Sequence, residues 1–166
     1  MKKHSKGKKL ETWVNRANIK YRTKGLALIV FNGTPVTITK TGVFLSKGKP
    51  DFDGLLKDGK YIAFDAKETN STTSLSLANL REHQVIYLKL VDDLEGIGFF
   101  LVHFYNIHET KAYKIPIKFI AKYWDAWKFE NGRASIPIKD LEEEWLVPIM
   151  DYLEVFNGTQ GSQEEE

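Results

Sequence analysis

The sequence contains no cysteine among its 166 residues. This excludes disulfide bonds, thiol catalysis and zinc sites built on cysteine. No apolar run approaches the roughly 20 residues that a membrane-spanning helix needs, so no membrane insertion is expected. The basic start of the chain is not followed by an apolar segment, which argues against a secretory signal and indicates a cytoplasmic protein.

Two common chemical signatures are also missing. The four histidines, at positions 4, 83, 103 and 108, do not form HxH or HExxH motifs, so the pattern indicates neither a zinc centre nor a histidine base. The chain has no GxxxxGK[ST] loop, which argues against a nucleotide-driven motor.

The residues that are present indicate one globular domain with charged ends. Hydrophobic residues make up 42% of the chain and aromatic residues 13%, enough for one core in a chain of this length. We expect a single domain over 1–158 and a disordered acidic tail over 159–166. The N-terminus is rich in lysine, and such a basic arm is suited to DNA phosphates, although a solvated tail has the same composition.

The hydrophobic pattern predicts an α/β fold. Apolar residues recur at helical spacing between Gly7 and Gly25, and Asn32-Gly33 is typical of a hairpin turn between strands 26–31 and 36–39. Glycines and lysines indicate an exposed basic loop over 41–49. The remaining predictions are strands 52–56, 61–67, 96–105 and 111–115, and helices 77–91, 116–127 and, as a short piece, 140–145. Together they predict a mixed central β-sheet flanked by helices.

Asp51, Asp65 and Lys67 carry the main chemical signal. Asp51 opens one predicted strand, and Asp65 and Lys67 lie two residues apart on the next, so their side chains share one face. Two carboxylates suit Mg²⁺, which prefers oxygen ligands and keeps several waters. An ammonium group beside the metal can stabilise a reacting phosphate. The alternative is a surface ion pair, for which Asp-x-Lys on a strand is common.

The motif set resembles the RecU-type Holliday junction resolvases of the PD-(D/E)xK nuclease superfamily. The resemblance rests on Asp51-Phe-Asp-Gly54, Tyr61-Ile-Ala-Phe-Asp-Ala-Lys-Glu-Thr69, Glu82-His-Gln84, Tyr123-Trp-Asp125 and Asn131-Gly-Arg133, which occur in the family's order. It implies a restriction-endonuclease-like fold with a short basic β-hairpin stalk at about 35–50. It also implies a homodimer that nicks opposing strands of four-way DNA junctions with Mg²⁺ or Mn²⁺. Such an enzyme would act with recombination proteins, and either a host or a phage could encode it.

By position, the resemblance gives each site residue a role. Asp51 and Asp65 look like metal ligands, Lys67 like the stabiliser of the transition state, and Gln84 like a further ligand. Glu11 matches an acidic residue on the superfamily's first helix, although an acid in a first turn also favours the helix dipole. Two neighbouring acids are supporting candidates, Asp53 and Glu68. Asp53 is the better one because it shares the face of Asp51.

The chain departs from the family in three places. Lys49 occupies a position that usually holds threonine, and its ammonium group cannot bind a cation. Asp65 replaces the more usual glutamate. The basic segment also looks shorter than the family's stalk, which weakens the case for junction selectivity more than the case for cleavage. Four residues of this segment are candidates for DNA contact, Lys40, Phe44, Lys47 and Lys49, although lysines also protect an edge hairpin from aggregation.

Three functions remain open from the sequence. The leading one is an Mg²⁺-dependent endodeoxyribonuclease that resolves four-way junctions. The second is a less selective nuclease of restriction-like or fork-cleaving type. The third is a junction-binding protein without catalysis, for which Lys49 is the main support. Cleavage of a junction with and without Mg²⁺ separates the third from the other two.

Overall fold

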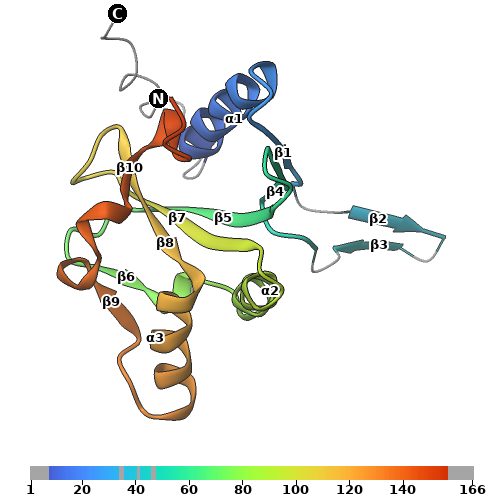
Figure 1. Ribbon diagram of the computed structural model, residues 1–166. Helices are drawn as coiled ribbons and strands as arrows, with labels where there is room; N and C mark the ends of the chain where they lie inside the picture. Colours follow the sequence, from blue (N-terminus) through green and yellow to red (C-terminus); the bar gives the residue numbers. More distant parts are fainter. Residues whose placement is uncertain (1–7, 34–35, 41, 46–47, 157–166) are drawn as a thin grey trace, which may run out of the picture.

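The computed structural model describes residues 8–33, 36–40, 42–45 and 48–156, and the side chains of residues 8, 36–39 and 42–45 are outside that description. A six-stranded sheet forms the centre, with α1 (Lys8–Thr23) on one face and α2 (Glu82–Asp93) and α3 (Ile117–Phe129) on the other (Figure 1). The predicted mixed α/β fold is therefore confirmed. The acidic tail predicted over 159–166 lies outside the described residues.

The central sheet combines one parallel pair with antiparallel neighbours. Its strands in spatial order are β1 (Ala27–Phe31), β4 (Phe52–Leu56), β5 (Tyr61–Thr69), β7 (Ile97–Phe104), β8 (Lys111–Pro116) and β10 (Leu146–Pro148). Strands β5 and β7 are parallel and occupy the middle, and α2 makes the crossover between them. The other neighbours run antiparallel. Helices cover β5 and β7 on both faces of the sheet, which agrees with the dense apolar sequences of these two strands.

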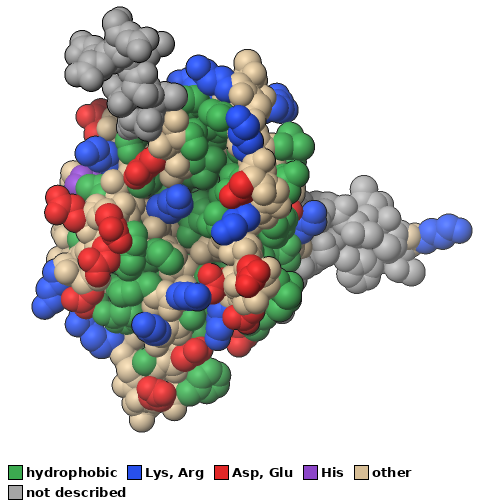
Figure 2. All heavy atoms as spheres, viewed as in Figure 1, with side chains coloured by type: hydrophobic (Ala, Val, Ile, Leu, Met, Phe, Trp, Pro, Cys, Tyr) green, Lys and Arg blue, Asp and Glu red, His purple; other side chains and the backbone are tan. Residues whose placement is uncertain are grey.

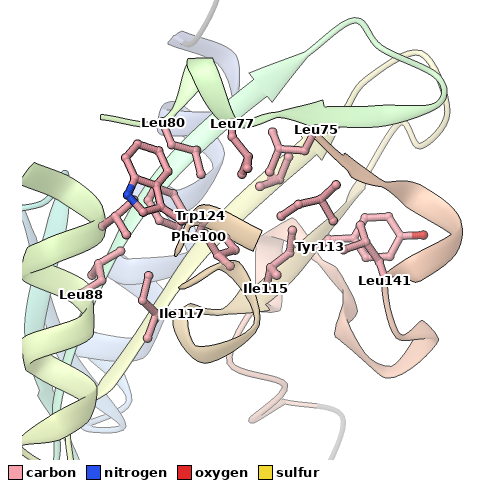
Figure 3. Packing of buried hydrophobic residues seen from close by; sticks show 14 of the residues in the cluster. Leu75, Leu77, Leu80, Leu88, Phe100, Tyr113, Ile115, Ile117, Trp124 and Leu141 are labelled. Atoms are coloured by element: carbon pink, nitrogen blue, oxygen red, sulfur yellow. The ribbon is translucent and has the colours of Figure 1, made fainter. Parts of the chain in front are cut away.

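Alternation along the central strands divides the interior into two clusters. Ala63 and Phe100 face α2 and α3, whereas Phe64 and Leu101 face α1. In the cluster beneath α2 and α3, side chains from both helices converge on β7 and β8 (Figure 3). Asp65 follows the same alternation as Ala63, so this carboxylate lies on the α2 face of the sheet and is fully buried.

Helix α1 ends where the sequence predicts. Its apolar face is buried through Leu10, Val14 and Tyr21. Gly25 has φ +66°, and the N–H groups of Gly25 and Leu26 bond the carbonyl oxygens of Arg22 and Tyr21. These two bonds form a Schellman motif, in which glycine adopts the left-handed conformation at little cost.

The predicted hairpin around Asn32-Gly33 is wrong. Strand β1 pairs with β4, with Phe31 opposite Phe52. Strand β2 (Val36–Thr39) instead pairs with β3 (Gly42–Leu45), within the segment predicted as a loop. The β2–β3 hairpin projects from the edge of the molecule (Figure 1). Asn32-Gly33 correctly indicated that β1 ends there. The strand that pairs with β1 begins about 20 residues further along the chain, and a local sequence pattern does not identify so distant a partner.

Several short elements complete the fold. Strands β6 (Ser74–Ser76) and β9 (Ser135–Pro137) pair with each other, and neither was predicted. The short helix predicted over 140–145 is replaced by two separate 3₁₀ turns, Ile138–Asp140 and Glu143–Trp145. Two further turns lie at Leu77–Asn79 and Ile149–Asp151. Among the helices in the described part of the chain, none is long and apolar enough to cross a bilayer.

Candidate active site

The pairing of β4 with β5 brings Asp51 and Asp65 together. Phe52 lies opposite Phe64, so the residue before β4 comes beside the residue after Phe64. The backbone N–H of Asp51 donates to Asp65 Oδ1 at 3.1 Å, and Asp51 Oδ2 accepts from the N–H of Ala66 at 3.1 Å. Each aspartate is thus tied to the other's strand, and the two carboxylates occupy fixed positions at the end of β4.

Asp65 is strongly perturbed by this environment. Its burial comes first and the negative charge of Asp51 second, and together they raise the pKa of Asp65 from 3.8 to about 7. The N–H of Asp51 and the positive charge of Lys67 act in the opposite direction. Two adjacent carboxylates in a buried place need a proton or a cation between them.

One atom of the pair shows where a cation fits. Asp65 Oδ2 is buried and has no hydrogen-bond partner within the described part of the chain. A buried oxygen without a partner is costly unless a metal, a water or a proton satisfies it. No group of three or more His, Cys, Asp or Glu residues suited to a metal occurs among the described residues. Two carboxylates with an amide nevertheless fit Mg²⁺, because this ion retains waters in most of its protein sites.

Lys67 lies on the same face of β5 as Asp65. The side chain is partly buried, and its charge lowers the pKa of Asp65. In this part of the sheet β5 pairs with β7, and Lys67 lies opposite Val102. The ammonium group therefore lies near the carboxylate pair and comes from β5, a strand in the interior of the sheet.

Gln84 reaches the same place from the first turn of α2. Its Nε2 donates to Asp65 Oδ1 at 3.1 Å, and its Oε1 accepts from the N–H of Arg81 at 3.2 Å. In this arrangement the amide nitrogen, not the oxygen, faces Asp65. A direct bond from Gln84 to a metal requires a rotation of the amide, which would exchange the two atoms.

The other two acids lie on the opposite side of the sheet. Glu68 Oε1 accepts from the N–H of Leu10 at 3.1 Å, and it is 3.7 Å from Nδ1 of buried His103. This carboxylate therefore meets the first turn of α1, where the helix dipole favours an anion. Glu11 belongs to the same turn and is partly buried. The contacts of α1 thus place Glu11 near the end of β5 that carries Lys67 and Glu68.

The DNA-binding candidates lie on or beside the β2–β3 hairpin. Lys40 is exposed at its turn. Lys49 is also exposed, and its ammonium group is 3.5 Å from Asp53 Oδ2, so it is drawn towards Asp53. Lys47 and the side chain of Phe44 lie outside the described residues.

The sequence did not identify the partners of Asp53. Asp53 is buried and accepts hydrogen bonds from Asn32 Nδ2 at 2.9 Å and from the Tyr61 hydroxyl at 2.7 Å. Tyr61 in turn lies 2.8 Å from the Tyr87 hydroxyl. The sequence pattern assigns Asn32 to a turn and Tyr87 to the helix predicted over 77–91, and it gives neither residue a polar partner. The one signal in the sequence was the alternation of Asp51 and Asp53, which places two carboxylates on one face.

Comparisons with known proteins show what this chain resembles in sequence and in fold. The sequence model of the family described as Recombination protein U matches residues 5–158. The Holliday junction resolvase RecU of Pediococcus pentosaceus is 32% identical, over 89% of this chain and 81% of its own length. The RecU resolvase of Bacillus pumilus is also 32% identical, over 98% of this chain and 85% of its own. The solved structure of Hjc, a Holliday junction resolvase from Archaeoglobus fulgidus, aligns with a TM-score of 0.47 and 11% identity, covering 84% of this chain and 96% of Hjc.

Proposed function

Because the chain belongs to the RecU family, we propose that it is an endodeoxyribonuclease that resolves four-way DNA junctions by paired nicks during recombination. The observation that carries this proposal is the contact between Asp51 and Asp65, with Lys67 on the same strand and Gln84 on the facing helix. The proposed location is the cytoplasm, because the DNA of the bacteria that carry these relatives lies there.

Mg²⁺ is the proposed cofactor, and Mn²⁺ is a substitute with similar ligand preferences. Asp51 and Asp65 would hold it, and the unsatisfied Oδ2 of Asp65 is the position that most needs it. Such an ion neutralises charge on a phosphate and makes a bound water more acidic. Gln84 would act either through its oxygen or by orienting Asp65 through the hydrogen bond that its nitrogen donates.

The chain's own residues supply the rest of the chemistry. The reciprocal backbone bonds hold the two carboxylates beside each other before substrate arrives, which limits the reorganisation that the reaction needs. Lys67 brings its ammonium group beside them and would stabilise the charge that develops on the phosphate. Its role requires a charged ammonium group and not merely a donor, because the phosphate is anionic throughout.

The β2–β3 hairpin is the proposed stalk that engages the junction. Lys40 stands exposed at its turn, and Lys49 stands exposed at its base. Lys47 and Phe44 belong to the same segment and are part of the proposal. Lysines along a projecting hairpin release counterions when they meet DNA phosphates, so binding should weaken as salt rises.

The proposed active form is a homodimer, because paired nicks in opposing strands need two sites. On the α2 face of the sheet, Leu28 and Leu55 lie opposite each other on β1 and β4 and are about half exposed. Hydrophobic side chains reach the surface on the side of the molecule that carries β1, β4 and α2 (Figure 2). We call this the β1–α2 surface, and its residues are Leu28, Val30, Leu55, Ile86, Leu90 and Leu94. A second copy that covers it would bury apolar area that otherwise faces water.

Sedimentation of the wild-type protein tests the dimer. Leu90→Glu places a charge in the middle of the surface and should convert the dimer to a monomer. Phe129→Glu is the matched control, because Phe129 is 80% exposed at the end of α3, outside this surface. A protein that sediments as a monomer before any substitution, or an equal effect of the two variants, would contradict the proposed interface.

The activity itself is tested by comparing a mobile four-way junction with linear duplex of the same sequence. We expect paired nicks in the junction with Mg²⁺ and none with a chelator. Equal cutting of both substrates would indicate a less selective nuclease. Junction binding without a product at any Mg²⁺ or Mn²⁺ concentration would indicate a binding protein without catalysis.

A further inference from the structure

Asp53 is a buried carboxylate that the proposed chemistry does not use. It is 8% exposed, lies on the α2 face of β4 and pairs with Ala63 of β5. Its Oδ1 accepts from Asn32, and its Oδ2 accepts from Tyr61 and lies 3.5 Å from the Lys49 ammonium group. Burying a carboxylate is costly unless hydrogen bonds or opposite charges compensate it. Contacts from three separate parts of the chain compensate Asp53.

Two of these contacts come from opposite ends of the stalk. Asn32 precedes β2, and Lys49 follows β3. Asn32 Nδ2 also donates to the carbonyl of Pro50 at 2.7 Å, and its backbone N–H donates to the carbonyl of Asp51 at 2.8 Å. Hydrogen bonds thus join the two segments at the base of the stalk, and one of these bonds ends on the backbone carbonyl of Asp51.

The third contact continues towards Gln84. The Tyr61 hydroxyl lies 2.8 Å from the hydroxyl of Tyr87 on α2. Burial, and after it hydrogen bonds to Tyr87 and Asp53, raise the pKa of Tyr61, so its hydroxyl stays protonated and can donate. Tyr87 is three residues from Gln84 on the same helix, a spacing that places them on one side of it. Gln84 bonds Asp65.

We propose that Asp53 is a positioning residue that couples the stalk to the carboxylate pair, so that engagement of DNA by the stalk adjusts Asp51 and Asp65 and raises the cleavage rate. The inference rests on the proposed function. One branch runs from the stalk base through Asn32 to Asp51, and the other runs through Tyr61 and Tyr87 to the helix that carries Gln84. DNA bound at the stalk then contributes to the chemical step and not only to affinity.

A double-mutant cycle tests this coupling. Asp53→Asn keeps the shape of the side chain but removes its charge and places an amide where Asn32 now donates. Lys40→Ala perturbs the stalk at its exposed turn. For each single variant and for the double variant, the single-turnover cleavage rate of the junction is measured at saturating protein, and junction affinity is measured without divalent metal.

We expect Asp53→Asn to lower the cleavage rate about tenfold or more, the scale seen when a partner that orients a metal ligand is lost. Its junction affinity should stay within about twofold, since a positioning role spares binding. Lys40→Ala should lower the cleavage rate in the wild-type background and have no further effect on it in the Asp53→Asn background, because residues that act through one network are not additive. Asp58→Asn is the control, because Asp58 is exposed in the β4–β5 turn, where its side chain accepts a hydrogen bond from the N–H of Lys60 and lies outside the network of Asp53.

Tyr61→Phe provides a second variant should Asp53→Asn fold poorly. It removes one hydroxyl and breaks only the connection from Asp53 through Tyr87 to α2. It should therefore lower the cleavage rate less than Asp53→Asn does. Additive effects of Asp53→Asn and Lys40→Ala, or a loss of affinity with an unchanged cleavage rate, would overturn the coupling. If the wild-type protein nicks no junction, the proposed function fails first. If it nicks normally and the cycle is additive, only the coupling fails.

Discussion

Asp51 and Asp65 hold each other through the backbone, since the N–H of Asp51 donates to Asp65 and the N–H beside Asp65 donates to Asp51. The geometry of the pair therefore depends on the register between β4 and β5. A carboxylate pair built this way is preorganised, and the cost of keeping two negative charges together is offset by folding of the sheet. The consequences can be measured on stability, on metal binding and on cleavage.

Stability without metal should fall as pH rises. The pKa of Asp65 is about 7 in the folded protein and returns to about 4 in the unfolded chain. Between these values the folded state binds more protons, so the free energy of unfolding decreases with pH by an amount on the order of a few kcal/mol. Asp65→Asn should remove most of this decrease and be more stable than the wild type at pH 8. Urea unfolding of both proteins from pH 4.5 to 8 in a chelator checks it, and parallel pH profiles would contradict it.

Gln84→Ala should weaken metal binding. The substitution removes the donor to Asp65 and the acceptor for Arg81, and loss of such a contact typically costs about 10- to 100-fold in metal affinity. The Mg²⁺ concentration for half-maximal cleavage should rise accordingly. Gln84→Glu, which keeps an acceptor for Arg81 and adds a carboxylate, should instead bind Mg²⁺ more tightly. An unchanged Mg²⁺ titration for Gln84→Ala would remove Gln84 from the site.

Gly54→Ala should destabilise the edge of the sheet that carries the stalk. A Cβ at this position would lie 1.9 Å from the carbonyl oxygen of Leu28 and 2.8 Å from Cα of Ile29. These are backbone atoms of β1, so β1 and β4 must separate, at a cost of about 3 kcal/mol. Gly59→Ala is the comparison, because Gly59 has φ +85° but no atom within 4 Å of a new Cβ, and strain there costs about 1 kcal/mol. Urea unfolding measures both, and equal losses would contradict the close approach.

Several helices and strands could be predicted from the sequence because the spacing of apolar residues within each segment is enough to identify it. Apolar spacing predicts the helix that buries Leu10 and Val14, the strand that carries Asp65 and Lys67, and the buried strand from Ile97 to Phe104. The approach of Asp51 to Asp65 followed from two neighbouring strands joined by a short turn. Such features need no knowledge of distant partners.

Features that depend on distant pairing could not be predicted in the same way. The partner of β1 is β4, across the whole stalk, and the pairing of β6 with β9 joins segments about 60 residues apart. The bonds from Asn32 and Tyr61 to Asp53 exist only after these strands are aligned. Periodicity assigns a residue to a face but does not name the side chain that meets it there.

The most direct measurement is cleavage of a mobile four-way junction by the Lys67→Ala protein. Lys67 is only partly buried and is not a member of either hydrophobic cluster, so the variant should fold and bind the junction as the wild type does. We expect wild-type protein to give paired nicks with Mg²⁺ and the variant to cleave about 10²- to 10³-fold more slowly, the scale of losing one group that stabilises developing charge. Full cutting by Lys67→Ala, at unchanged junction affinity, would contradict the assignment of the site on Asp51, Asp65 and Lys67.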